Sequence, residues 1–350
     1  MRLLILYTEL AGYVLVNIES FVRMHPNAKV LLIHYPVNPE APFQLNAIDG
    51  VESITYQSTH EQSISNQINA FDPEVIFCSG WTNGFYLSIV KAFKQAKNIL
   101  GFDNHWRGTF KQHLLTLTAK WHVLNWFQYV WLPGQPQLTY ALKMGFKPEN
   151  CFTGLYPGDV RLFSAIASSR FDRLNTSTFP KVMISVARYI KEKDLSTLWK
   201  AFINANKQTG NQWVLKCYGL GPLYDDRIQN EYIHHMGFVQ PSDMTNAIAD
   251  AGIYILPSVF EPWGVAVHEM AMSGLPLVLS DQVGSRTMFL DKDNGFEFKA
   301  GSEKALTDVL IRIMKMDEQS LKNMSIASHQ KGLTLRNEDW CHTLEQIFNA

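Results

Sequence analysis

The stretch that most constrains the fold runs from residue 252 to 280 and reads GIYILPSVFEPWGVAVHEMAMSGLPLVLS. It contains an apolar strand at 253–256, a helix at about 264–273 and a second apolar strand at 277–279. Both strands are apolar at every position, which is typical of parallel strands that are covered on both faces. The stretch therefore predicts one βαβ unit.

This unit carries two carboxylates, with Glu261 in its loop and Glu269 on its helix. Ligands of open α/β sheets bind at the carboxyl ends of the strands, so we expect Glu261 at a functional edge. Glu269 alone would suit a solvated or capping role. The pair at this spacing favours a functional role.

Apolar segments of strand length alternate with helix-like stretches along the whole chain. They lie at 3–7, 30–34, 75–78, 99–102, 129–132, 182–186, 213–218, around 237–239, 253–256 and 277–279. This alternation predicts doubly wound parallel sheets, and a length of 350 residues favours two domains. We interpret residues 164–180, which lack apolar periodicity, as the linker. The expected α/β domains are 1–165 and 166–335, facing a central cleft, with a C-terminal helix at 336–350 that packs back on the first domain.

Charge and cysteine content exclude several classes of protein. The net charge of -1 gives no general attraction to nucleic acid, and the four scattered cysteines indicate neither a zinc site nor a disulfide framework. We expect reduced cysteines and a cytoplasmic protein. The apolar opening could be a signal peptide, but Thr8 and Glu9 interrupt it, which favours a buried first strand. The sequence contains no run of 18 apolar residues, so it predicts no membrane-spanning helix.

The helix that begins near Gly264 would direct backbone N–H groups and its positive dipole end toward the ligand. We therefore expect a phosphate group to bind there. Arg188 follows the strand at 182–186, and Lys193 comes five residues later. A guanidinium and an ammonium can flank one diphosphate without a metal. Gly284 lies in a further small-residue loop at the same edge. The glutamates would then accept hydrogen bonds from sugar and ribose hydroxyls.

Three sequence patterns imitate other sites. Asp291-Lys292-Asp293 matches a metal-binding D-x-D, but its DKDNG context predicts a surface turn, and we expect no metal site. His268-Glu269 does not continue into a zinc-binding H-E-x-x-H, because Met272 takes the last position. The segment at 219–222 lacks the third glycine of a dinucleotide fingerprint, which disfavours a nicotinamide oxidoreductase.

The run S-x-x-E-P-W-G-V-A-x-x-E-M-A-x-x-G-L-P-L-V at 258–278 closely resembles the E-x7-E signature of retaining family 4 glycosyltransferases of GT-B fold. Three further segments also resemble that family: ISVARYIKEKDLSTLWKAF its Arg-x4-Lys element, YGLGPLYDD its glycine-rich strand end, and MGFVQPSDMTNAIADAGIYILPS the approach to the signature. The similarity covers about 181–316; in the first half only YPGDVRLF resembles the family. Asp194 departs from the glycine that the family commonly has there.

The resemblance implies a GT-B architecture of two Rossmann-like domains and a role for each candidate residue. Arg188 and Lys193 would hold the donor diphosphate, Glu261 the sugar hydroxyls and Glu269 the ribose. The other implied donor contacts are Gly12, Trp263, Gly264 and Val265, with Gly237, Phe238 and Val239 near the base. His105 would face the sugar, with Asp103 as the competing candidate.

The function implied is a retaining, metal-independent glycosyltransferase without a further cofactor. It would transfer a hexose from a UDP- or GDP-linked donor to a glycan or lipid-linked acceptor, as in the synthesis of polysaccharide, lipopolysaccharide or glycolipid. The alternatives are a nucleotide-sugar epimerase or hydrolase, and a non-catalytic nucleotide-sugar-binding subunit.

A helix at about 109–128 carries a stripe of apolar side chains at spacings of three and four, namely Phe110, Leu114, Leu117, Trp121 and Leu124. Residues 91–120 hold six lysines and arginines against Asp103 alone, a local charge of +5. One interpretation is a packed core helix with a solvated basic flank. The other is a surface that meets an anionic membrane from the first domain, as a peripheral contact.

Overall fold

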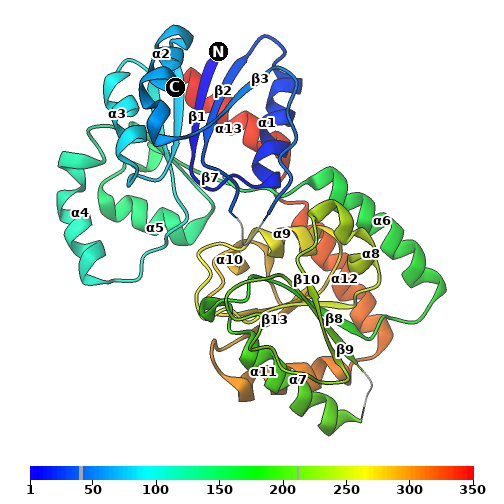
Figure 1. Ribbon diagram of the computed structural model, residues 1–350. Helices are drawn as coiled ribbons and strands as arrows, with labels where there is room; N and C mark the ends of the chain where they lie inside the picture. The colour runs from blue at the N-terminus through cyan, green and yellow to red at the C-terminus, as the bar shows by residue number, and fades with distance from the viewer. Residues whose placement is uncertain (39–41, 211–212) are drawn as a thin grey trace. The chain divides into compact units, whose positions relative to one another are not determined.

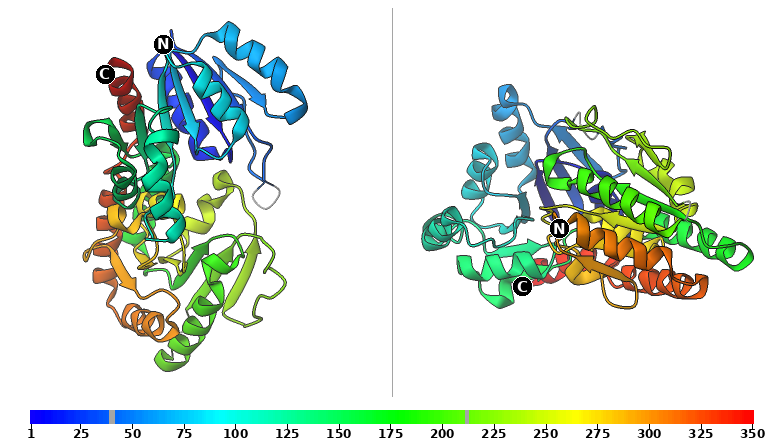
Figure 2. Two further views of the ribbon diagram at one scale, coloured as in Figure 1. Left: turned by 90° about the vertical axis from the view of Figure 1, so that its left-hand side faces the viewer. Right: turned by 90° about the horizontal axis from the view of Figure 1, so that it is seen from below.

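The computed structural model describes residues 1–38, 42–210 and 213–350, which divide into two compact units (Figure 1). The first unit is formed by residues 1–38, 43–157 and 336–350, and the second by residues 158–335. Each unit contains one parallel β-sheet with helices on both of its faces (Figure 2). The second unit is therefore inserted, in chain order, into the first.

The first sheet has the strand order β3-β2-β1-β4-β5-β6-β7 and is parallel throughout. Its strands are β1 (Arg2–Tyr7), β2 (Lys29–His34), β3 (Val51–Thr55), β4 (Val75–Ser79), β5 (Lys97–Gly101), β6 (Tyr129–Leu132) and β7 (Cys151–Thr153). The order changes direction between β1 and β4, where the Thr8 N–H donates to Ser79 Oγ at 3.0 Å. Such a switch point is where α/β sheets bind ligands.

Helices cover both faces of this sheet. They are α1 (Gly12–Met24), α2 (Glu61–Phe71), α3 (Gly84–Ala92), α4 (Phe110–His122), α5 (Gln135–Met144) and α13 (Asn337–Asn349). Leu3 and Ile5 face the cluster that contains α1 and α13, whereas Leu4 and Leu6 face the cluster that contains α2 to α5. This burial on both sides is the physical reason that the strands are apolar at successive positions.

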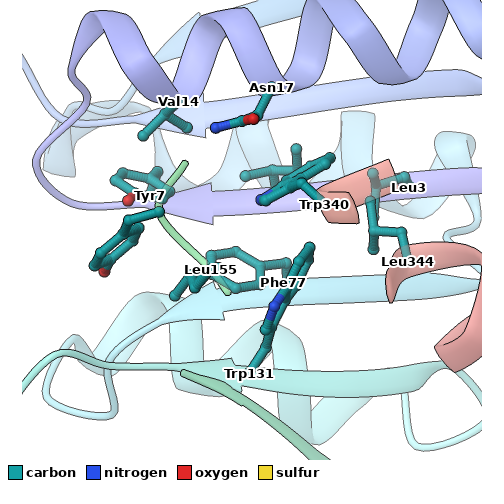
Figure 3. A pocket seen from close by; sticks show the side chains of 11 residues that line it. Leu3, Tyr7, Val14, Asn17, Phe77, Trp131, Leu155, Trp340 and Leu344 are labelled. Atoms are coloured by element: carbon teal, nitrogen blue, oxygen red, sulfur yellow. The ribbon is translucent and has the colours of Figure 1, made fainter. Parts of the chain in front are cut away.

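A small cavity of about 20 Å³ lies between the sheet, α1 and α13 (Figure 3). Its lining includes Trp131 from β6 and Trp340 from α13, whose ring centroids lie 5.0 Å apart. A volume of that order holds roughly one water molecule. The cavity is thus a packing feature of the core and is too small for a sugar or a nucleotide.

The second sheet has the order β10-β9-β8-β11-β12-β13 and is also parallel. Its strands are β8 (Val182–Val186), β9 (Val214–Tyr218), β10 (Ile233–Gly237), β11 (Ile253–Leu256), β12 (Leu277–Ser280) and β13 (Gly295–Phe298). Its helices are α6 (Val160–Thr176), α7 (Leu195–Thr209), α8 (Thr245–Ala249), α9 (Val265–Met272), α10 (Arg286–Phe289), α11 (Glu303–Met314) and α12 (Glu318–Gly332). The predicted βαβ unit is confirmed as β11, α9 and β12.

One expectation from the sequence is wrong, and one of the two interpretations of α4 is excluded. Residues 164–180 are not a linker, because α6 runs through most of them as one helix that begins at the Asp159 N-cap. The stripe on α4 is not packed into the core, because Phe110 is 82% exposed and Leu117 is 71% exposed. The sequence prediction also missed β3, β7 and β13, and placed β10 a few residues late.

Candidate functional site

The carboxyl ends of β8, β9 and β10 lie side by side at one edge of the second sheet. The Ala187 N–H donates to the Tyr218 carbonyl at 3.0 Å, and the Gly219 N–H donates to the Gly237 carbonyl at 2.7 Å. Arg188 is the second residue after β8, and it therefore lies at this edge with Gly237. Gly237 has a φ of +72°, and Phe238 and Val239 follow it into the loop.

Lys193 and Glu261 meet in the second unit as an ion pair between Nζ and Oε2. Both side chains are largely buried, with 14% and 11% of their surfaces exposed. Lys193 ends the short 3-10 helix η3 (Lys191–Lys193), and the Glu192 carbonyl accepts a hydrogen bond from the Val259 N–H at 2.9 Å. Two loops, one after β8 and one after β11, are thereby joined.

The backbone conformation at Asp194 explains why a glycine suits this position, as expected from the family that the sequence resembles. Its φ of +46° lies in the left-handed region, which favours glycine and which aspartate tolerates better than most residues. The chain turns there from η3 into α7. The departure from glycine is therefore compatible with the turn that holds Lys193.

Gly264 is required by its contact with Glu261 as well as by its conformation. Its φ is +91°, and a Cβ atom there would lie 3.0 Å from Glu261 Cγ. A Cβ on Gly284 would lie 2.1 Å from the Pro262 carbonyl oxygen, so the two loops touch through backbone. The Gly284 N–H donates to the Glu261 carbonyl at 3.0 Å, and the Ser285 N–H donates to the Trp263 carbonyl at 2.9 Å.

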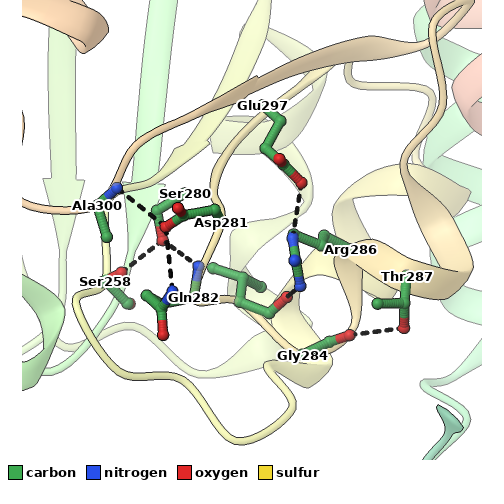
Figure 4. A network of polar contacts seen from close by, with 10 residues as sticks. Ser258, Ser280, Asp281, Gln282, Gly284, Arg286, Thr287, Glu297 and Ala300 are labelled. Carbon is green, nitrogen blue, oxygen red and sulfur yellow. Dashed lines mark hydrogen bonds and ion pairs between the residues drawn. The ribbon is translucent and has the colours of Figure 1, made fainter. Parts of the chain in front are cut away.

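A polar network braces the loop that follows β12 (Figure 4). Asp281 Oδ1 accepts a hydrogen bond from the Ala300 N–H at 3.0 Å, and Arg286 Nε pairs with Glu297 Oε2 at 2.7 Å. Thr287 Oγ1 donates to the Gly284 carbonyl at 2.9 Å. The position of Gly284 against the Glu261 loop is thus fixed by contacts from β13 and α10.

Glu269 lies on α9, the helix that begins at Val265 with Gly264 as its N-cap. The side chain is half-buried, and burial together with the nearby charge of Asp159 raises its pKa to about 7. A Cβ on Gly158 would lie 3.0 Å from Glu269 Cγ, so the backbone before α6 packs on this glutamate. Glu269 can therefore gain or lose a proton near neutral pH.

Tyr254 of β11 is a site residue that the sequence prediction missed. It is fully buried, and its hydroxyl has no hydrogen-bond partner among the residues that the structure describes. Burial and the negative charges of Glu261 and Glu269 raise its pKa well above 10.0, so the phenol stays protonated. A tyrosine inside an apolar strand gives no signal of this kind in the sequence.

His268 has a structural role in the second unit. Its Nδ1 accepts a hydrogen bond from the Gly158 N–H at 3.0 Å, which leaves Nε2 to donate to the Gly332 carbonyl at 2.8 Å. Its ring stacks on Phe289 at 4.3 Å, and burial lowers its pKa to about 4. The imidazole is therefore neutral and ties α9 to the segments beside α6 and α12.

The remaining predicted residues belong to the first unit. Gly12 is the first residue of α1, in the loop region after β1. His105 lies in the loop after β5, and its carbonyl accepts a hydrogen bond from Gln112 Nε2 at 2.8 Å. Asp103 lies in the same loop; burial, and to a smaller extent the charge of Asp103, raises the pKa of Tyr13 and of Tyr156. The sequence prediction missed these tyrosines.

Residues 169–331 match the family model described as "Glycosyl transferases group 1". The matched range contains Arg188, Lys193, Glu261 and Glu269. Most of the second unit is therefore similar to group 1 glycosyltransferases.

Curated relatives match over part of their length. A probable sucrose-phosphate synthase from Vicia faba is 25% identical over 211 residues, which cover 52% of this chain and 20% of that protein. A phosphatidyl-myo-inositol mannosyltransferase from Mycobacterium leprae is 28% identical over 121 residues, which cover 34% of this chain and 31% of that protein. The chain thus spans less than a third of the length of either relative.

Solved structures resemble the chain over its whole length. A glycosyltransferase from Rickettsia africae has a TM-score of 0.74 at 12% identity and covers 99% of this chain and 97% of its own. A sucrose-phosphate synthase from Thermosynechococcus elongatus has a TM-score of 0.74 at 15% identity, covering 99% and 98%. Anabaena HepE, solved with UDP and glucose, has a TM-score of 0.71 at 16% identity. It covers 99% of this chain and 98% of its own. The two parallel-sheet units have the GT-B fold, as the sequence predicted.

Proposed function

We propose that this protein is a retaining glycosyltransferase of family 4 that transfers a sugar from a nucleotide diphosphate sugar to an acceptor hydroxyl without a metal. The observation that carries the proposal is the similarity of the second unit to group 1 glycosyltransferases, together with Lys193, Glu261 and Gly264 at one sheet edge. The second unit would hold the donor, and the first unit would recognise the acceptor. A UDP-linked hexose is the first donor to test, because the similar HepE was solved with UDP-glucose.

The cations of the second unit would stabilise the leaving diphosphate. Arg188 in the loop after β8 and Lys193 at the end of η3 supply two positive charges, and the amino end of α9 adds the positive end of a helix dipole. Groups of this kind stabilise charge that develops in the transition state. In the free protein Lys193 pairs with Glu261, so an arriving diphosphate would share or take over this ammonium.

The reaction would proceed on one face of the sugar. The bond between the anomeric carbon and the donor's phosphate oxygen breaks, and a bond forms to the acceptor oxygen. The acceptor proton passes to the departing diphosphate oxygen, and the anomeric configuration is kept. Glu261 would hold the sugar hydroxyls and favour the positive charge that develops on the ring, without forming a covalent bond.

Glu269 would bind the donor ribose through its carboxylate oxygens. Because the pKa of Glu269 is about 7, its ability to accept hydrogen bonds from the ribose would depend on pH. The charges of both glutamates also act on the protonated phenol of Tyr254.

A ligand screen followed by product analysis tests the function. We expect UDP, GDP or ADP, or one of their sugars, to raise the melting temperature, because a ligand that binds the folded state stabilises it. With the stabilising donor and a pool of acceptors, proton NMR of the product should show the donor's anomeric configuration. An inverted product would refute the retaining mechanism. If the donor is converted to an epimer or to free sugar in the absence of an acceptor, the protein is instead an epimerase or a hydrolase. If the donor binds but no turnover follows, the protein is a binding subunit.

A further inference from the structure

Helix α4 of the first unit presents a continuous apolar face to solvent. Phe110 is 82% exposed, Leu114 53%, Leu117 71% and Trp121 59%. Their spacings of four, three and four place all four on one face of the helix. These four make up almost half of the nine large exposed apolar side chains in the part of the chain that the structure describes. Figure 1 shows α4 at the outer edge of its unit, beside α5.

The opposite face fixes α4 firmly to the first unit. Ala119 is fully buried in the core cluster under the sheet, and Leu115 packs against the same cluster. Thr109 and Gln112 form a capping box at the start of the helix, in which the Gln112 N–H donates to Thr109 Oγ1 at 3.3 Å. The apolar face is therefore held outward by the fold.

Basic side chains border this face, and carboxylates are absent from the surrounding sequence. Residues 104–148 contain no aspartate or glutamate but contain Arg107, Lys111, Lys120, Lys143 and Lys147. Lys111 follows Phe110 and Lys120 precedes Trp121, so the helical turn of about 100° per residue puts one lysine on each border of the stripe. The Lys120 ammonium lies 4.5 Å from the centre of the Trp121 ring.

We propose that α4 docks the protein on an anionic lipid bilayer, with Phe110, Leu114, Leu117 and Trp121 in the boundary between headgroups and acyl chains. A helix with such an apolar face and a basic border has the composition of interfacial helices, and tryptophan suits the boundary itself. Lys111 and Lys120 would reach lipid phosphates on the two sides. A second copy fits this face less well, because a two-fold contact would bring the lysines of both copies together.

This docking is peripheral. None of the helices that the structure describes is long and apolar enough to cross a membrane. The proposal does not depend on glycosyl transfer, because it rests on exposure and charge in the first unit alone. Its test therefore uses no donor and no acceptor.

Co-sedimentation of the full chain with vesicles tests the proposal. We expect binding to phosphatidylcholine vesicles that contain phosphatidylglycerol, weaker binding to pure phosphatidylcholine, and loss of the difference at high salt. Lys111→Glu with Lys120→Glu should weaken binding at least about 25-fold, since each lysine near the surface contributes about fivefold. Leu117→Glu should weaken it about tenfold or more, because a charge would enter the apolar boundary.

Matched variants separate docking from general effects. Ile326→Glu changes a side chain on α12 that is 47% exposed, and Lys200→Glu changes an exposed lysine on α7. Both should bind vesicles as the wild type does, and all variants should keep the wild-type melting temperature. The proposal is overturned if the wild type does not bind, or if the α4 variants bind equally well. It is also overturned if light scattering without lipid shows a dimer that Leu117→Glu dissociates, because α4 would then be a contact between copies.

Discussion

Lys193 and Glu261 are 68 positions apart in the sequence, yet Nζ of one and Oε2 of the other form an ion pair that is largely withdrawn from water. The pair joins the loop after β8 to the loop after β11. Burying two charges costs free energy that their mutual attraction only partly offsets. An arrangement of this kind stabilises the fold modestly, but it holds a carboxylate and an ammonium ready beside Gly264.

Replacing Lys193 with alanine separates its structural and its chemical roles. We expect turnover to fall about 100-fold or more, because the variant lacks the positive charge that would stabilise the negatively charged leaving diphosphate. The free energy of unfolding should fall by about 1–3 kcal/mol, because Glu261 loses its buried partner. Urea denaturation and initial rates measure the two effects.

The exposed Lys191 of the same 3-10 helix provides the control for this experiment. Lys191→Ala should leave both turnover and stability close to wild type. Adding Glu261→Gln to Lys193→Ala should recover most of the lost stability without recovering turnover. Wild-type rates in Lys193→Ala would rule out its role toward the diphosphate.

Gly264→Ala should lower stability and disturb Glu261 together. Its φ of +91° disfavours an alanine by about 1–2 kcal/mol, and the new Cβ would lie 3.0 Å from Glu261 Cγ. Gly210→Ala is the matched control, because Gly210 has a φ of +60° but no neighbour within 4 Å of the added atom among the residues that the structure describes. Both variants should lose stability in urea, whereas only Gly264→Ala should weaken donor binding by calorimetry. If the two variants bind the donor with equal affinity, Glu261 does not take part in donor binding.

The raised pKa of Glu269 should make stability fall with rising pH. The folded protein holds a proton on this group up to about pH 7, whereas the unfolded chain releases it near its ordinary value of 4.5. The folded state therefore binds more protons between these values, and this contribution to stability is lost as the pH rises through about 7. The difference in unfolding free energy between wild type and Glu269→Gln should fall over this range and level off above it.

Asp159→Asn tests the cause of this dependence. Asparagine can still cap α6, as Asp159 does through its bond from the Leu162 N–H at 2.9 Å, but it carries no charge. The pKa of Glu269 should then move down, and the stability change should end at lower pH. An unchanged profile would show that Asp159 does not act on Glu269.

His268 should have the opposite dependence on pH. Its folded pKa of about 4 lies below its ordinary 6.5, so the unfolded chain binds more protons between these values. Its contribution is present above about pH 6.5 and is lost as the pH falls toward 4. His268→Phe should remove this dependence and cost about 2–4 kcal/mol, because Gly158 N–H and the Gly332 carbonyl lose their partner.

Buried strands could be predicted from the sequence, and edge strands could not. The central strands β1, β4, β8, β11 and β12 are covered on both faces, so nearly every position is apolar and the signal is strong. The edge strand β3 has only partly buried or exposed residues, and its sequence VESIT carries no such run. The misplaced linker at 164–180 has a similar cause, because α6 is rich in serine and charged residues and its Arg170 is fully buried.

Within the candidate site, the local relationships were predictable and the distant ones were not. The spacing of Glu261, Gly264 and Glu269 follows from one βαβ unit. The pairing of Lys193 with Glu261 depends on how separate strands align. For α4, the periodicity was predicted correctly but the burial of the stripe stayed open, because an apolar stripe looks the same whether it faces a core or an external surface.

Helix α13 packs on the sheet of the first unit, with Trp340, Cys341, Leu344 and Ile347 in the cluster that contains Leu3 and Ile5. On the ribosome these residues are made after the whole of 158–335, so the inserted unit can finish folding while the first sheet still lacks one of its covering helices. Trp131 and its neighbours then stand uncovered during translation. We therefore expect the first sheet to stay incomplete at least for the time needed to synthesise the second unit.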